Sequence, residues 1–162
     1  NQGVKMSLLN PVRLLLLVLV IFGSLVLAPW TGSGVRAAET IIAAPDVRAA
    51  ALAGSVIIID VRSPREWRQT GVPSGARTVT IHNCNGIKVF VAQMVKAVGG
   101  DKSKPVALIC AAGARSARAL KILTAAGFTK IQNVSEGMLG RPDAGPGWLK
   151  RGLPVTQPAS LR

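Results

Sequence analysis

Across residues 108–118 the chain reads Leu108-Ile109-Cys110-Ala111-Ala112-Gly113-Ala114-Arg115-Ser116-Ala117-Arg118. The apolar run at residues 106–109 predicts a buried strand, the helical spacing at 116–126 predicts a helix, and the residues between them predict a tight turn. Cys110 is therefore expected at a strand end, where unpaired N–H groups of the next helix point back toward its sulfur. These groups and the positive helix end favour the thiolate, which is the reactive form of a cysteine.

The residues after Cys110 are candidates for holding whatever the sulfur binds. Three alanines and a glycine project almost nothing into the turn, so its backbone amides can converge on an atom attached to the sulfur. We therefore take Cys110 as the candidate catalytic nucleophile. The candidate substrate-binding residues are Ala111, Ala112, Gly113, Ala114, Arg115 and Ser116. An isolated cysteine near a strand end is more often structural, but the unbroken order of strand, cysteine, small-residue loop, arginine and helix favours a reactive one.

The rest of the chain alternates strand and helix patterns. Apolar and β-branched runs predict strands at residues 40–43, 55–60, 77–81, 106–109 and 130–134. Helical spacing, proline starts and glycine ends predict helices at residues 45–53, 87–98 and 116–126, a short helix capped by Ser63, and a turn at 71–75. This alternation predicts an α/β fold with a mainly parallel five-stranded sheet and helices on both faces. Ligands of such sheets bind at the carboxyl ends of the strands, where Cys110 is expected.

Composition limits the classes of function. The 162-residue chain has 20 Lys and Arg residues against 7 Asp and Glu, a net charge of +13. This length predicts one domain, large enough to bury a core without disulfides. Aromatic residues make up only 4% of the chain, and no run of five basic residues occurs. We therefore expect no nucleic acid partner, and a positive field that attracts small anions instead.

The N-terminal part has the pattern of a secretory signal. Residues 6–37 contain a basic start that ends at Arg13, an apolar stretch at 14–28, and small residues around Arg36 that suit cleavage. The uncharged stretch at 14–35 leaves a membrane anchor as the alternative. We expect a periplasmic or secreted domain at residues 40–156, or the same domain anchored in the membrane and facing the periplasm.

Three parts of the chain resemble rhodanese-type sulfurtransferases. The loop from Cys110 to Ser116 resembles their active-site loop, in which a cysteine and an arginine bracket the substrate cradle. Two stretches resemble the first signature of this family, namely Asp60-Val61-Arg62-Ser63-Pro64-Arg65-Glu66-Trp67 and Gly75-Ala76. Their C-terminal pattern is resembled by Gly127-Phe128, Val134, Gly137, Trp148 and Gly152-Leu153-Pro154-Val155. The resemblance spans residues 40–155 and implies a single rhodanese-like domain, of an exported bacterial type given the N-terminal pattern.

The resemblance implies a sulfurtransferase. Cys110 would take a sulfane sulfur from a donor such as thiosulfate or polysulfide as a persulfide, and pass it to cyanide or a thiol acceptor. Arg115 would brace the loop. Asp60 and Arg62 match family residues that flank the pocket, although an aspartate at a strand end also serves as a cap. No cofactor or metal is implied, and the partners would be small sulfur-containing anions and the acceptor, with a membrane only if the N-terminal segment is retained.

Other functions stay open at this point. Related phosphatases and arsenate reductases carry one more residue between the cysteine and the arginine, so the shorter spacing here favours sulfur over a tetrahedral oxyanion. A non-catalytic sulfur-binding or docking module is the other alternative, and docking modules of this fold lack the cysteine. The chain departs from the family pattern at Val72, at Glu136-Gly137 and at Ala111, where a histidine, a glycine pair and a basic residue are common. The missing basic residue weakens the case for thiosulfate in particular.

The remaining polar candidates give no further site. His82 is the only histidine, and its setting predicts a loop residue rather than a catalytic base. Cys84 and Cys110 are both expected near one edge of the sheet, but neighbouring loops easily miss disulfide geometry, so we expect two free thiols. The chain shows no zinc-ligand spacing, phosphate loop or dinucleotide glycine pattern.

Overall fold

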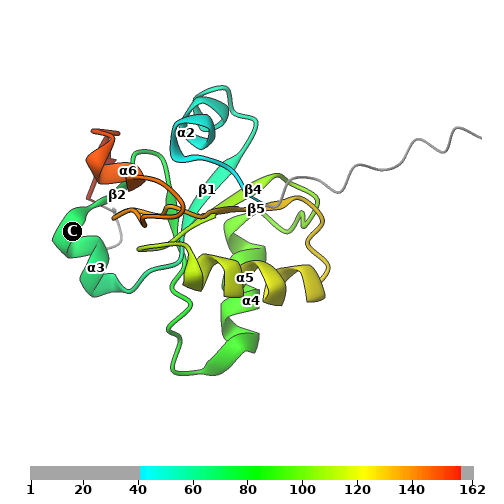
Figure 1. Ribbon diagram of the computed structural model, residues 1–162. Coiled ribbons are helices and arrows are strands. Elements are labelled where there is room, and N and C mark those ends of the chain that lie inside the picture. Colours follow the sequence, from blue (N-terminus) through cyan, green and yellow to red (C-terminus); the bar gives the residue numbers. More distant parts are fainter. Residues whose placement is uncertain (1–40, 158–162) are drawn as a thin grey trace, which may run out of the picture. The chain divides into compact units, whose positions relative to one another are not determined.

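The computed structural model describes residues 41–157 (Figure 1). The predicted signal or anchor segment at residues 6–37 and the start of the predicted first strand at Thr40 lie outside the described residues. The helices are α2 (Ala44–Leu52), α3 (Pro64–Thr70), α4 (Gly86–Ala97), α5 (Ala114–Ala125) and α6 (Gly147–Lys150). The strands are β1 (Ile57–Asp60), β2 (Val72–Pro73), β3 (Arg77–Thr78), β4 (Val106–Ile109), β5 (Ile131–Val134) and β6 (Val155–Thr156). Among these helices, none is long and apolar enough to cross a bilayer.

Four strands form one parallel sheet in the order β3-β1-β4-β5. β4 lies inside this sheet, with Val106 paired to Ile57 of β1 and to Ile131 of β5. Parallel strands are joined by crossover connections. α4 forms the connection from β3 to β4, and α5 forms the connection from β4 to β5. The predicted α/β fold with a parallel sheet is confirmed.

The edge strand expected at residues 40–43 is reduced to a single bridge. Ile41 pairs in parallel with Asn133 of β5, and the Ile42 N–H donates to the Asn133 carbonyl at 3.1 Å. Because α2 begins at Ala44, the chain turns into a helix before a ladder can extend. The main sheet of the described chain therefore has four strands, where five were expected.

The sheet has a separate apolar layer on each face, as Figure 1 shows with α2 and α6 on one side and α4 and α5 on the other. Successive side chains of a strand point to opposite faces. Val106 and Leu108 pack with residues of α4 and α5, whereas Ala107 and Ile109 pack with residues of α2 and α6. Burial on both faces explains why β4 is apolar at every position.

The third predicted strand is shorter than expected. Residues 77–81 alternate in polarity, but only Arg77 and Thr78 form the ladder with β1. The Val79 and Ile81 N–H groups then donate to the consecutive carbonyls of Asp60 and Val61, each at 3.1 Å. The two donors are two residues apart, but their acceptors are consecutive residues, so the regular pairing with β1 ends here. The chain then leaves the sheet toward α4.

The predicted turn at residues 71–75 contains a strand that the sequence pattern did not indicate. Val72 and Pro73 form β2, which pairs antiparallel with Val155 and Thr156 of β6. A two-residue strand has too few positions to show alternation. Its partner lies more than eighty residues away, so only the folded chain brings the pair together.

The start of α3 is as predicted. The Ser63 side chain accepts the Glu66 N–H, and the Glu66 carboxylate accepts the Ser63 N–H at 3.0 Å, which together make a capping box. Pro64 occupies the first turn of the helix, where it removes no needed hydrogen bond.

A buried carboxylate joins the C-terminal tail to the start of α2. Glu136 is 1% exposed, and it accepts the N–H groups of Ala44 at 2.8 Å and of Gly147 at 2.9 Å. Arg151 Nε donates to it at 2.9 Å. Burial alone would raise the pKa of Glu136, but these hydrogen bonds outweigh it and lower the pKa. Glu136, which the sequence indicated only as a departure from a glycine pair, therefore stays ionised in the core.

Candidate functional site

Cys110 lies directly after β4, at the carboxyl end of the sheet. Its neighbour Ile109 pairs with Asp60 at the end of β1. The residue is 1% exposed. Three residues separate the cysteine from α5, which begins at Ala114 rather than at the expected Ser116. The helix start is therefore closer to the sulfur than the sequence pattern indicated.

The backbone of the Cys110 loop is held by hydrogen bonds from the segment at residues 135–139. The Met138 N–H donates to the Cys110 carbonyl at 2.8 Å, and the Leu139 N–H donates to the Ala111 carbonyl at 2.9 Å. Gly137 allows this approach, because a Cβ atom there would lie 2.5 Å from the Ala111 oxygen. Because both carbonyls accept hydrogen bonds from this segment, the loop keeps a fixed shape around the sulfur.

Gly113 sets the direction in which the loop enters α5. Its φ angle is +85°, in the left-handed region that favours glycine. A Cβ atom at this position would lie only 2.1 Å from the Ser135 carbonyl oxygen. Both the backbone angle and the neighbouring chain therefore require glycine here.

Ser116 is the loop residue whose side chain reaches the sulfur. Its hydroxyl oxygen lies 3.3 Å from Cys110 Sγ and 3.0 Å from the Gly113 carbonyl oxygen. The side chain belongs to the first turn of α5 and is fully buried. The hydroxyl can thus donate to a negatively charged sulfur.

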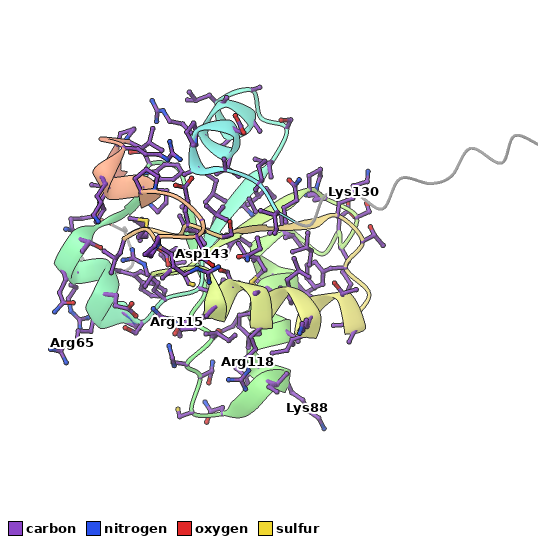
Figure 2. The ribbon with its side chains drawn as sticks, in the orientation of Figure 1. Arg65, Lys88, Arg115, Arg118, Lys130 and Asp143 are labelled. Atoms are coloured by element: carbon purple, nitrogen blue, oxygen red, sulfur yellow. The ribbon has the colours of Figure 1, made fainter. Side chains whose placement is uncertain are left out.

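Arg115 forms an ion pair with Glu66 of α3, and this pair braces the loop. Its Nη1 and Nη2 atoms donate to the two Glu66 carboxylate oxygens at 2.7 and 2.6 Å. His82 Nε2 lies 3.0 Å from the same Nη1 atom. Figure 2 shows Arg115 at the α5 end that faces α3. The ion pair thus connects the two helices that begin at this edge of the sheet.

Glu66 and His82 were not among the site residues expected from the sequence. Glu66 does give a local signal, but that signal is fully explained by the capping box with Ser63. Nothing in the sequence indicates that the same carboxylate reaches Arg115, 49 residues further along the chain. His82 is an exposed loop residue, as predicted, but it also contacts Arg115.

The ion pair changes the acidity of both partners. The Arg115 hydrogen bonds lower the pKa of Glu66 from its usual 4.5 to about 2, against the opposing effect of burial. The Glu66 hydrogen bond in turn raises the pKa of Arg115, with further contributions from Cys110 and Asp60. The brace is therefore fully charged at every pH above about 4.

The low pKa of Glu66 predicts a loss of stability in acid. A carboxylate whose folded pKa lies near 2 stabilises the fold fully above its unfolded value of about 4.5, and this contribution is lost as the pH falls toward 2. In Glu66→Gln, the free energy of unfolding should therefore fall by about 2 kcal/mol less between pH 5 and pH 2 than in the wild type, after allowance for partial exposure. Urea unfolding between pH 5 and pH 2 measures it. Asp143→Asn, in the exposed pair with Arg141, is the control and should change the profile much less; equal changes would contradict the prediction.

Asp60 and Arg62, the possible pocket residues, form a buried ion pair with each other. Arg62 Nε lies 3.0 Å from both Asp60 oxygens, and both residues are almost fully buried. The Arg62 guanidinium also donates to the Gly71 carbonyl at 2.6 Å and to the Thr70 hydroxyl at 2.8 Å. Asp60 lies beside the strand end that carries Cys110, but the pair mainly ties β1 to the end of α3.

Neither cysteine forms a disulfide. Cys110 is buried and Cys84 is exposed, and both are free. Residues 41–157 hold no group of three or more His, Cys, Asp or Glu side chains that could bind a metal ion. The site thus contains one free, buried sulfur near the start of α5. A hydroxyl donor and a braced loop lie next to it.

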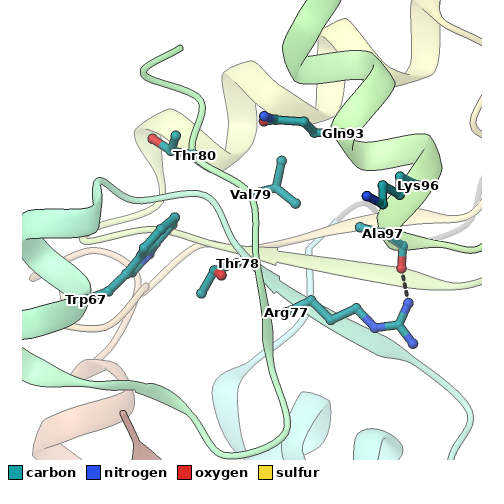
Figure 3. Close-up of a pocket in the computed structure, with 8 residues that line it drawn as sticks. All are labelled: Trp67, Arg77, Thr78, Val79, Thr80, Gln93, Lys96 and Ala97. Carbon is teal, nitrogen blue, oxygen red and sulfur yellow. Dashed lines mark hydrogen bonds between the residues drawn. The ribbon is translucent and has the colours of Figure 1, made fainter. Parts of the chain in front are cut away.

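A pocket elsewhere in the domain belongs to a different surface. It has a volume of about 580 Å³ and lies between α3, the chain after β3, and α4 (Figure 3). Its lining residues are Trp67, Arg77, Thr78, Val79, Thr80, Gln93, Lys96 and Ala97. Arg77 donates to the Ala97 carbonyl at its edge. None of the Cys110 loop residues lines it.

Comparisons with known proteins agree with this geometry. A family model described as a rhodanese-like domain matches residues 43–140. A sulfurtransferase of Allochromatium vinosum is 26% identical over 103 residues, which cover 64% of this chain and 80% of that protein. The crystal structure of Rv0390 from M. tuberculosis is 27% identical, with a TM-score of 0.58 and coverage of 75% of this chain and 98% of that one. The polysulfide-sulfur transferase homodimer of Wolinella succinogenes is 27% identical, with a TM-score of 0.54 and coverage of 75% and 80%.

Proposed function

Because this chain belongs to the rhodanese-like domain family, we propose that it is a sulfurtransferase that carries a sulfane sulfur on Cys110. The observation that carries the proposal is the position of Cys110 Sγ, at the start of α5 and 3.3 Å from the Ser116 hydroxyl. The sulfurtransferase named among its relatives supports the same class of reaction.

The proposed reaction has two steps. In the first, the Cys110 thiolate attacks the outer sulfur of the donor and forms a new S–S bond, while the donor's own S–S bond breaks. The electron pair of that bond leaves with the rest of the donor, which is sulfite when the donor is thiosulfate and a shortened chain when it is a polysulfide. In the second, the acceptor attacks the terminal sulfur and Cys110 recovers its thiolate, so that no external oxidant or reductant is needed.

The loop stabilises the negative terminal sulfur of the persulfide. The turn amides and the Ser116 hydroxyl act as fixed donors, in the manner of an oxyanion hole that accepts sulfur. Arg115 is neutralised by Glu66 and therefore positions the loop more than it attracts substrate. Ala111 adds no charge where family members often have a basic residue, which weakens the case for thiosulfate, so we take polysulfide as the preferred donor. The polysulfide-sulfur transferase among the similar structures supports that choice.

The alternatives raised by the sequence are not favoured. The family match and the named relatives point to sulfur transfer and not to phosphate or arsenate chemistry. A docking module without activity would have no need of the loop shape around Cys110 that Gly113 and Gly137 maintain here by close approach of two chain segments.

We further propose an exported enzyme that acts on small sulfur-containing anions. The N-terminal pattern at residues 6–37 supports a periplasmic or secreted location, with membrane attachment only if that segment is retained. The acceptor is cyanide or a thiol, and the composition argues against a nucleic acid partner.

Mass spectrometry of the treated protein tests the proposed function. The reduced chain is incubated with thiosulfate or with polysulfide, and its intact mass is measured before and after cyanide is added. We expect a gain of one sulfur atom that cyanide removes, and peptide mapping should place it on Cys110 and not on Cys84. No gain with either donor, or a gain on Cys84 alone, would contradict the proposal.

A further inference from the structure

The described chain has a large excess of positive charge that its ion pairs do not use. Residues 41–157 contain 16 Lys and Arg residues and 6 Asp and Glu residues. Four of the six acidic residues, at positions 60, 66, 136 and 143, are already paired with an arginine. The unpaired charge on the surface is therefore almost entirely positive.

Part of this charge lies on the two helices that begin at the same edge of the sheet as the Cys110 loop. Arg65 precedes Glu66 in the first turn of α3, and Arg118 follows Arg115 by one turn of α5. Both side chains are exposed, and neither forms an ion pair within residues 41–157. Figure 2 shows them on the same side of the domain as Arg115. Helices that follow parallel strands begin at the carboxyl edge of the sheet, which is also the edge that carries Cys110.

Two further residues complete this surface. Arg141 Nη1 lies 3.5 Å from the Ala112 carbonyl, so a third arginine lies against the loop itself, although its charge is paired with Asp143. Leu139 is 49% exposed, although its N–H donates to the Ala111 carbonyl. We call Arg65, Arg118, Arg141 and Leu139 the basic rim. A single exposed apolar side chain is common on protein surfaces, so the rim is characterised by its arginines, a residue type enriched at protein interfaces.

The loop suits an acceptor that is carried on another protein. Cys110 is almost fully buried, so a thiol that is carried on a protein must project toward it from a surface that sits close to the loop. Ala111, Ala112 and Ala114 offer no long side chains that would keep such a surface away. A membrane or a nucleic acid would match the charge of the rim but would bring no thiol.

We propose that the basic rim docks an acidic, cysteine-bearing protein, which accepts the sulfur from Cys110. The inference rests on the proposed function and adds the class of acceptor to it. The partner thiolate attacks the terminal sulfur of the Cys110 persulfide and forms a new S–S bond. The S–S bond of the enzyme persulfide breaks, and its electron pair returns to Cys110 Sγ. Carboxylates beside the partner cysteine pair with Arg65 and Arg118, and an apolar side chain covers Leu139.

Two synthetic peptides test this proposal. Both contain one cysteine and one leucine, with four flanking glutamates in one peptide and four glutamines in the other. The full chain is loaded with sulfur from polysulfide, and the rate at which each peptide gains a sulfur is followed by mass spectrometry. We expect transfer to the glutamate peptide to be about tenfold faster at low salt, and this ratio to fall toward one as salt is raised.

A matched pair of variants locates the effect. Arg118→Glu should slow transfer to the glutamate peptide about tenfold and change transfer to the glutamine peptide less than twofold. Lys130→Glu makes the same change in charge before β5, at the opposite edge of the sheet (Figure 2), and should leave both rates within twofold. Equal losses in the two variants would show that only the overall charge matters and would overturn the docking surface.

Other outcomes separate this inference from the proposed function. Equal rates for both peptides, in a protein that still transfers sulfur to cyanide, would overturn the inference and leave the function intact. Loss of binding to phosphatidylglycerol vesicles in Arg118→Glu, with equal peptide rates, would assign the rim to a membrane instead. Failure to load Cys110 at all would overturn the function itself.

Discussion

Cys110→Ser should lower sulfur transfer to cyanide by about 10³-fold or more, because the variant has no thiolate that can form a persulfide. A serine hydroxyl is a far weaker nucleophile, and its oxygen cannot carry the sulfur through the second step. The side chain is nearly the same size, so the buried position should still be filled. The rate of thiocyanate formation with polysulfide as the donor measures the loss.

Cys84→Ser is the matched control for this experiment. Cys84 is an exposed free thiol in the chain before α4, and the proposed reaction does not use it. Its replacement should change the rate less than twofold. A Cys110→Ser variant that transfers sulfur as fast as the wild type, or an equal loss in both variants, would show that the reaction does not proceed through Cys110 alone.

Gly113→Ala should destabilise the domain by about 3 kcal/mol and remove most of its activity. An alanine at a φ of +85° is strained, and its Cβ atom would lie 2.1 Å from the Ser135 carbonyl oxygen. Because that neighbour is backbone, either the Cys110 loop or the segment after β5 must move. Urea unfolding measures the stability, and the cyanide assay measures the activity.

Gly75→Ala separates the strain of the backbone angle from the collision. Gly75 has a φ of +82°, but no atom lies within 4 Å of the position of a Cβ there. Its replacement should cost about 1 kcal/mol and leave sulfur transfer unchanged. If both alanines cost the same, the close approach at Ser135 is not what makes Gly113 necessary.

The sequence predicted best the features that are set by neighbouring residues. The all-apolar β4, the cysteine at its end and the helix cap at Ser63 depend on contacts within a few positions, and all were found where they were expected. The order of strands and helices was enough to predict a parallel sheet with its site at the carboxyl edge.

What the sequence did not predict depends on contacts between distant segments. The Glu66–Arg115 ion pair and the fit of Gly113 against Ser135 need the folded backbone to bring separate loops together. Arg62 was predicted as a possible pocket residue from its place in a family signature. The structure adds that its guanidinium donates to Asp60 and to the end of α3.

The carboxylate of Glu136 also determines the order in which the domain can be completed during synthesis. It binds the N–H of Ala44 at the start of the first described helix, while its counter-charge, Arg151, comes close to the C-terminus. A ribosome releases residue 44 long before residue 151. The first helix can therefore gain this contact only after residue 136 has been made, and the carboxylate in it gains its counter-charge only when residue 151 follows.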